Sequence, residues 1–154
     1  MGNAMGKGWI LLAFCFALAG PAWAAGKAEK GGAPPVADAD VRAVRDVIEA
    51  QLEAFAAEDA TRAFSYASPA IREQFGGADA FLAMVRQGYP MVIRPSARSF
   101  YQPEADGDGV WQTVLLRDPD GKEWRATYQL QRQKDRSWRI NGCVIVPDDG
   151  RSST

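Results

Sequence analysis

The pattern of hydrophobic and polar residues changes its period once, near Pro90. Before Pro90, apolar residues recur every three or four positions, and after it they alternate with polar ones. The first spacing is typical of amphipathic helices, and the second is typical of half-buried strands. The chain therefore predicts an α+β fold, with N-terminal helices packed on one face of a curved antiparallel sheet.

Four helices are predicted before Pro90. Asp40 is expected to N-cap the longest, which runs to about residue 57, and Asp59 to N-cap a second that ends near Tyr66. Ser68 followed by Pro69 predicts the start of a third helix, which Gly76 ends. The fourth spans residues 78–87, and the residues predicted to face inward are Val41, Val44, Ile48, Leu52 and Phe55 in the first helix and Phe81, Leu82 and Val85 in the fourth.

About four strands are predicted after Pro90, at residues 91–102, 110–117, 123–131 and 138–146. Pro95 implies an edge position or a bulge in the first of them. Residues 104–109, 118–121 and 133–136 are predicted turns, because they are rich in Asp, Gly and Pro or strongly polar.

The registry of the last hairpin predicts which side chains share the concave face of the sheet. Centring its turn on Asp135 gives the pairs Trp124–Val146, Ala126–Val144, Tyr128–Gly142 and Leu130–Ile140. A symmetric turn at residues 118–121 adds Trp111, Thr113 and Leu115 to this face. A slip of one residue would instead add Val110, Gln112, Val114 and Leu116.

This predicted face offers aromatic and aliphatic groups but no acid or base. Glu123 and Arg125 fall on the opposite face. The chain has no histidine, which removes the commonest general base and most zinc chemistry. No catalytic residue, metal site or cofactor is therefore predicted, and the sequence favours a non-enzymatic protein over an enzyme. The formal net charge of -1 argues against a nucleic-acid partner.

An aromatic-walled pocket for a small apolar ligand is one interpretation of the concave face, and plain core packing is the other. Gly142 either opens space opposite Tyr128 or marks a bulge. Cys143, out of phase with the concave face, is expected to be a buried small hydrophobe, with an intermolecular disulfide as the second reading. Gln51, at the edge of the buried stripe, is either half exposed or orients the ligand. The candidate pocket residues are Gln51, Tyr66, Phe81, Trp111, Trp124 and Tyr128.

Residues 1–24 are predicted to be a secretory signal peptide. Lys7 supplies its positive charge, residues 9–18 its apolar run, and Ala22-Trp23-Ala24 a cleavage site. Cleavage after Ala24 would leave a periplasmic or secreted protein without a membrane span; the alternative is an uncleaved anchor helix. Residues 25–36 are predicted to be a flexible linker, 37–148 the folded domain, and 149–154 a disordered tail.

The order of these parts resembles the nuclear transport factor 2-like (NTF2-like) superfamily, also called SnoaL-like. Within it, the chain is similar to an exported bacterial family known as domain of unknown function 4864. The resemblance covers residues 40–146 and rests on QLEAF at 51–55, AFSYASPAIREQF at 63–75, MVRQGYP at 84–90 and WRINGCVIV at 138–146. It implies a cone-shaped α+β fold and no established activity, because the superfamily hosts isomerases, hydrolases and non-catalytic modules alike.

The leading hypothesis is an exported, non-catalytic module that binds a small apolar ligand or a protein partner. The alternative is a small-molecule isomerase or lyase of the ketosteroid isomerase-like type, whose acid would come from a helix. Homodimerisation through the exposed face of the sheet is a further possibility that the resemblance implies.

Overall fold

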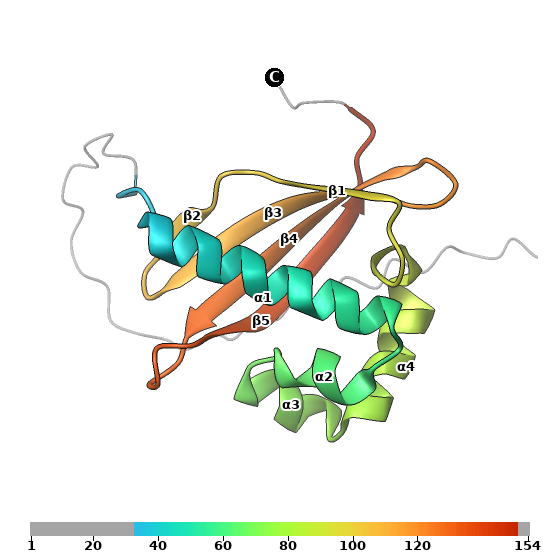
Figure 1. Ribbon diagram of the computed structural model, residues 1–154, viewed down its shortest axis with the longest axis horizontal. Helices are drawn as coiled ribbons and strands as arrows, with labels where there is room; N and C mark the ends of the chain where they lie inside the picture. The colour runs from blue at the N-terminus through green and yellow to red at the C-terminus, as the bar shows by residue number, and fades with distance from the viewer. Residues whose placement is uncertain (1–32, 151–154) are drawn as a thin grey trace, which may run out of the picture. The chain divides into compact units, whose positions relative to one another are not determined.

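The fold is an antiparallel sheet with helices on one of its faces (Figure 1). A computed structural model of the chain describes residues 33–150. The helices are α1 (Asp38–Ala56), α2 (Ala60–Ser65), α3 (Pro69–Phe75), α4 (Ala78–Gly88) and the 3-10 helix η1 (Pro90–Val92). The strands are β1 (Ala97–Phe100), β2 (Glu104–Asp106), β3 (Gly109–Arg117), β4 (Glu123–Arg132) and β5 (Trp138–Pro147).

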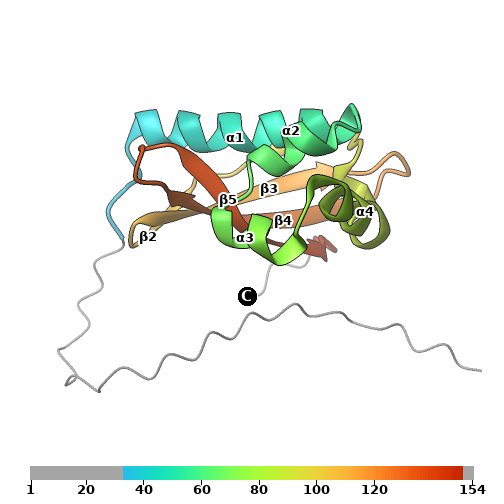
Figure 2. The same ribbon diagram turned by 90° about the horizontal axis from the view of Figure 1, so that it is seen from below.

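The sheet is open, with the strand order β1-β3-β4-β5, and β2 pairs with the other end of β3. In Figure 2, α1 and α2 lie on one side of the sheet. This arrangement confirms the predicted α+β class. None of the described helices is long and apolar enough to cross a membrane. The predicted signal peptide and most of the predicted linker lie outside the described residues.

Local capping signals set most of the helix boundaries. The Asp59 carboxylate accepts a hydrogen bond from the N–H of Arg62 at 2.9 Å, and Ser68 Oγ accepts one from the N–H of Ile71 at 3.3 Å. Gly76 ends α3 in the left-handed conformation, at φ 70°. The prediction for Asp40 was wrong: α1 begins two residues earlier, and Ala37 is its N-cap.

Two predictions near the start of the strands were also wrong. Residues 91–102 do not form one long strand, because η1 takes up residues 90–92 and β1 is only four residues long. Residues 104–106 are not part of a turn but form β2, which pairs with Gly109, Val110 and Trp111. Only Gly107 and Asp108 are left to turn the chain between β2 and β3.

The register of β5 changes at a bulge. Leu130 pairs with Ile140 as predicted, but Gln129 pairs with Gly142, so Asn141 is an extra residue in β5. Beyond the bulge, Tyr128 pairs with Cys143 rather than Gly142, and the predicted pairs of Trp124 and Ala126 are likewise displaced by one residue. One extra residue exchanges the two faces of a strand. Cys143 and Ile145 therefore face the helices, and Val144 and Val146 face outward.

The inner face of β3 carries Val110, Gln112, Val114 and Leu116, the residues expected if the register slips by one residue. Gln112 pairs with Tyr128 and Val114 with Ala126, and both are fully buried. The symmetric turn was therefore the wrong choice, and Trp111, Thr113 and Leu115 lie on the outer face. The core between this inner face and the helices contains mostly aliphatic and aromatic side chains, including Val44, Ile48, Leu52, Phe55, Phe81, Leu116, Leu130 and Ile140.

Candidate functional site

Four phenylalanine rings, one from each of α1, α2, α3 and α4, pack together. The ring of Phe81 lies 6.0 Å from Phe55, 5.4 Å from Phe64 and 5.5 Å from Phe75, measured between centroids. These spacings are those of directly contacting aromatic rings. The space that the sequence assigned to a ligand near Phe81 is therefore occupied by the protein's own side chains.

Gln51 and Tyr66, two of the candidate pocket residues, have structural contacts. Gln51 is buried, and its Nε2 donates to the carbonyl of Ala63 at 3.1 Å, which ties α1 to α2. The expectation of a half-exposed Gln51 was wrong. Tyr66 is half-buried and caps the C-terminus of α2, and its carbonyl accepts from the N–H of Ile140 at 2.8 Å.

Tyr128 and Cys143 lie opposite each other on the inner face of β4 and β5. Burial raises the pKa of the Cys143 thiol to about 12 and holds the pKa of Tyr128 well above its usual value. Both groups therefore stay neutral near pH 7. Cys143 is partly buried and packs against the core as a small hydrophobe, so its predicted phase was wrong, and the expected burial is only partial.

The two remaining candidates, Trp111 and Trp124, lie on opposite faces of the sheet. Trp111 is on the outer face, and its indole N–H donates to the carboxylate of Asp106 at 2.8 Å. Trp124 packs against the core, and its indole N–H donates to Asp118 at 2.9 Å, which lowers the pKa of Asp118. Trp111 therefore cannot join a concave-face pocket with the other candidates.

A polar connection that the sequence did not reveal joins α3 to the bulge of β5. Ser68 Oγ, besides capping α3, lies 2.9 Å from Oδ1 of Asn141, and Asn141 Nδ2 lies 3.4 Å from Oε1 of Gln129. The N–H of Ser68 donates to the carbonyl of Ile140 at 2.8 Å. The segment between α2 and α3 is thus bonded along the start of β5 and covers that part of the sheet edge.

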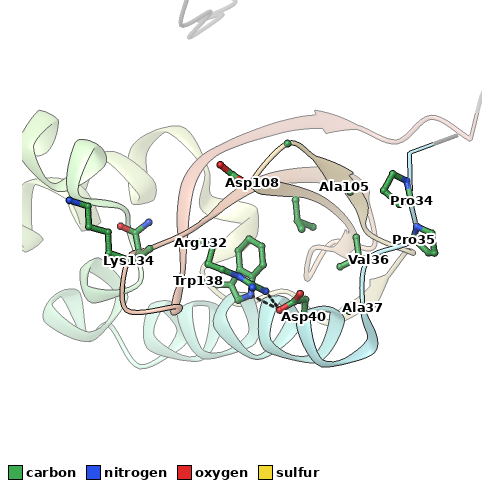
Figure 3. Close-up of a pocket in the computed structure, with 14 residues that line it drawn as sticks. Pro34, Pro35, Val36, Ala37, Asp40, Ala105, Asp108, Arg132, Lys134 and Trp138 are labelled. Carbon is green, nitrogen blue, oxygen red and sulfur yellow. Dashed lines mark hydrogen bonds and ion pairs between the residues drawn. The ribbon is translucent and has the colours of Figure 1, made fainter. Parts of the chain in front are cut away.

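A hollow of about 470 Å³ lies beside the start of α1 (Figure 3). The chain before α1, the β2–β3 hairpin and the β4–β5 turn form its walls. Within it, the Asp40 carboxylate accepts from Arg132 and from the Trp138 indole, and the Arg132 guanidinium stacks 4.8 Å from the Trp138 ring. Lys134 and Asp108 also line it. This volume is large enough for a small ligand. None of the six candidate pocket residues lines this hollow.

The outer faces of β3, β4 and β5 form a second candidate site, which we call the open face. It carries Trp111, Thr113, Leu115, Thr127, Val144 and Val146. Val144 is 57% exposed and Val146 is 46% exposed. Arg125, which lies between Leu115 and Val146 on this face, pairs with Asp148 at 3.0 Å, and Arg117 pairs with Glu123 at 2.6 Å. The open face therefore combines apolar side chains with threonines and paired charges, and these charges balance.

Acid–base groups are not gathered in the interior. Among residues 33–150, no aspartate or glutamate is buried. Glu49 and Glu53 on α1, and Glu58 in the turn after it, pair with arginines at 3.6, 3.3 and 2.9 Å, where water reaches them. Within the same residues, no group of His, Cys, Asp and Glu side chains could hold a metal ion. A helix-borne general acid in the core is therefore not among the described side chains.

Comparisons with known proteins agree with this fold. The model of the family described as "Domain of unknown function (DUF4864)" matches residues 37–153. A crystal structure of an NTF-2 like protein of unknown function from Silicibacter pomeroyi DSS-3 is similar, with a TM-score of 0.50 and 18% identity, over 71% of this chain and 96% of that chain. A crystal structure from Kribbella flavida DSM 17836, described as a known function protein, has a TM-score of 0.42 and 19% identity, over 67% and 84% of the two chains. No curated protein matches the chain. The first likeness shows an NTF2-like fold.

Proposed function

The chain belongs to the DUF4864 family of domains of unknown function, and we propose that it is a non-catalytic module that binds a protein partner through the open face. The observation that carries this proposal is the exposure of Val144 and Val146, which lie together on the outer face of β5. Exposed apolar groups that lie together are typical of protein interaction sites. Single exposed apolar residues would need no such explanation.

The charges around the open face favour a protein over a nucleic acid as the partner. Arg117 and Arg125 each have a carboxylate within 3.0 Å, so neither offers an unpaired charge to a phosphate. Thr113 and Thr127, whose hydroxyls lie 3.4 Å apart, make the middle of the face flat and weakly polar. Such a surface suits a partner with a flat apolar surface of its own.

Site-specific photo-crosslinking in producing cells tests the proposal. A photoreactive side chain in place of Val144 should give a discrete protein adduct, and Val146→Glu should reduce that adduct about tenfold by placing a charge in the contact. The matched control probe replaces Ala83, which is exposed on α4. An adduct of equal yield from the Ala83 position, or one that Val146→Glu leaves unchanged, contradicts the proposal.

A small amphipathic ligand is the second candidate, and the hollow beside α1 favours it. Its walls combine Trp138 and Val110 with the charged groups of Lys134 and Asp108. A ligand that binds only the folded state raises the unfolding temperature. Thermal-shift measurements with fatty acids and sterols should then show stabilisation that Lys134→Ala weakens for the anionic ligands. No ligand-dependent shift would exclude these ligand classes.

We also propose that the module acts after export, in the periplasm or outside the cell. The support is the sequence of residues 1–24 alone, with Lys7, an apolar run and the cleavage pattern Ala22-Trp23-Ala24. Mass spectrometry of the protein purified from its producing cell should find Ala25 as the first residue. A chain that keeps residues 1–24 and remains in the cytoplasm contradicts this proposal.

A further inference from the structure

The β1 edge of the sheet has backbone groups without a hydrogen-bond partner. The N–H of Tyr101 donates to the carbonyl of Thr113 at 3.0 Å, and β1 pairs residue by residue with β3. Bonded and non-bonded pairs alternate in an antiparallel ladder. Ser99 and Ala97 therefore bond to β3, whereas the N–H and C=O of Arg98 and Phe100 point away from the sheet. Within residues 33–150, no backbone hydrogen bond reaches them.

The sequence around this edge is symmetric about Ser99. Pro95 and Pro103 each stand four residues from Ser99, and proline has no N–H to extend a ladder. The edge therefore offers one short window, in which donors and acceptors repeat at Arg98 and Phe100. A second copy of the same strand, running antiparallel, presents the same groups at the same spacing.

We propose that two copies of the chain pair along β1, with a two-fold axis at Ser99. Arg98 of each copy then lies opposite the partner's Phe100, and each such pair exchanges both of its N–H···O bonds. The sheet becomes continuous across the two copies. This inference does not depend on the partner proposed for the open face.

Charged groups on the inner side of β1 are complementary in this arrangement. Glu49 Oε1 lies 3.6 Å from Nε of Arg98, and the Arg45 guanidinium lies 5.7 Å from the centre of the Phe100 ring. Cross-strand neighbours have their Cβ atoms about 5 Å apart. Pairing Arg98 with the partner's Phe100 therefore brings the Arg98–Glu49 ion pair of one copy toward Arg45 of the other, so that Glu49 gains a second positively charged neighbour. Symmetry repeats this contact.

The outer side of the pair covers an exposed aromatic ring. Tyr101 is 48% exposed, and the same register places it opposite the partner's Ala97, whose small side chain leaves room for the ring. The other edge of the sheet differs, because the Tyr66–Ser68 segment is bonded to Ile140 there. A two-fold pairing uses the β1 edge of both copies, so the association closes as a dimer instead of growing into a fibre.

Amide hydrogen exchange combined with light scattering tests this inference. As the concentration of the purified chain rises, the mass should approach that of a dimer, and the amides of Arg98 and Phe100 should exchange at least about tenfold more slowly. The amides of Ala97 and Ser99 are the internal control, because they already bond to β3 and should change little. A dimer formed through the open face would leave Arg98 and Phe100 unprotected.

Two variants at the two-fold axis complete the test. Ser99→Asp places like charges opposite each other and should weaken dimerisation about tenfold or more, whereas Ser99→Ala, which is matched in size and position, should not. A chain that stays monomeric at every concentration overturns the inference, and so does a dimer in which the Arg98 and Phe100 amides are unprotected. Neither result affects the crosslinking expected from Val144. The dimer through β1 and the partner at the open face can therefore be contradicted independently of each other.

Discussion

The two faces of the sheet have the same alternating pattern in the sequence but different surroundings in the structure. On the inner face, Leu130, Tyr128 and Val114 are buried under the helices, and even the polar Gln112 is 0% exposed. On the outer face, Val144 and Val146 remain about half exposed. Burial of apolar area contributes most of the stability of a fold, so the inner face stabilises the protein and the outer face contributes much less to its stability.

The difference also extends to polar groups. Inner-face Gln112 donates from Nε2 to the carbonyls of Tyr101 and Thr113, at 2.8 and 2.9 Å, and so bonds β3 to the segment that follows β1. Outer-face Arg117 and Glu123 form an ion pair in contact with water. Hydrogen bonds in the interior are costly to break, whereas surface ion pairs contribute little. Substitutions on the inner face should therefore change the free energy of unfolding more than substitutions on the outer face.

The largest effect is expected from removing a buried side chain of the inner face. Leu130→Ala should lower the free energy of unfolding by about 2–5 kcal/mol, because it leaves a cavity. The matched outer-face variant Val144→Ala should change it by no more than about 0.5 kcal/mol. Urea unfolding measures both. Equal losses from the two variants would mean that the outer face is covered in solution.

A smaller loss is expected where the helical layer bonds to β5. Ser68→Ala removes the N-cap of α3 and the contact with Asn141, and should cost about 1–2 kcal/mol. Ser65→Ala is the control, since Ser65 Oγ bonds only to the carbonyl of Arg62 in the same helix. If both serine variants unfold at the same urea concentration, the contact between Ser68 and Asn141 contributes nothing.

The buried Cys143 thiol should make the protein less stable at alkaline pH. In the folded chain the pKa of this thiol is raised to about 12, whereas an unfolded thiol loses its proton near pH 8.5. Between these values the unfolded state binds fewer protons, so the stability falls as pH rises, by roughly 1 kcal/mol from pH 9 to pH 10. Burial also raises the pKa of Tyr128, so this residue lowers the stability further as pH rises above about 10.

Urea unfolding at pH 8, 9 and 10 measures this dependence, in a Cys15→Ser background that leaves one thiol. Cys143→Ala should flatten the decline while Tyr128 is retained. A decline of the same slope in both proteins would show that Cys143 does not titrate differently on folding.

The smallest effect is expected from the ion pairs beside the open face. Glu123→Gln removes the partner of Arg117 and should cost less than about 1 kcal/mol, with no measurable cost in 1 M salt. Unfolding at low and high salt checks this. A cost above about 2 kcal/mol that persists in salt would place this pair in a buried interface and so contradict an exposed outer face.

The helices could be predicted closely because their boundaries depend on neighbouring residues. Asp59, Ser68 and Gly76 cap their helices through contacts that span three or four positions. Asp40 was misassigned because its partners, Arg132 and Trp138, are distant in the sequence. A carboxylate two residues inside a helix and one at its cap have similar sequence signatures.

The candidate site was less predictable, because it depends on strand register. Three of the six pocket candidates were chosen from one face of the sheet, yet one of them, Trp111, lies on the other face, and the helix candidate Gln51 bonds to Ala63. The exposure of Val144 and Val146 could not be predicted, because it results from the bulge at Asn141, which reverses the two faces of β5. Gly142 beside Asn141 was a signal for this bulge, but the sequence does not say on which strand pair or at which residue a bulge falls.

The sequence by itself determined the α+β class, the order of the elements and the short helix that Ser68, Pro69 and Gly76 delimit. These features follow from local caps and from hydrophobic periodicity, which are properties of adjacent residues. Only the tertiary structure decided which way Val144 and Cys143 face. The extra residue at Asn141 exchanges the two faces of β5, and its position is fixed by contacts with Ser68 and Gln129, which are far from it in the chain.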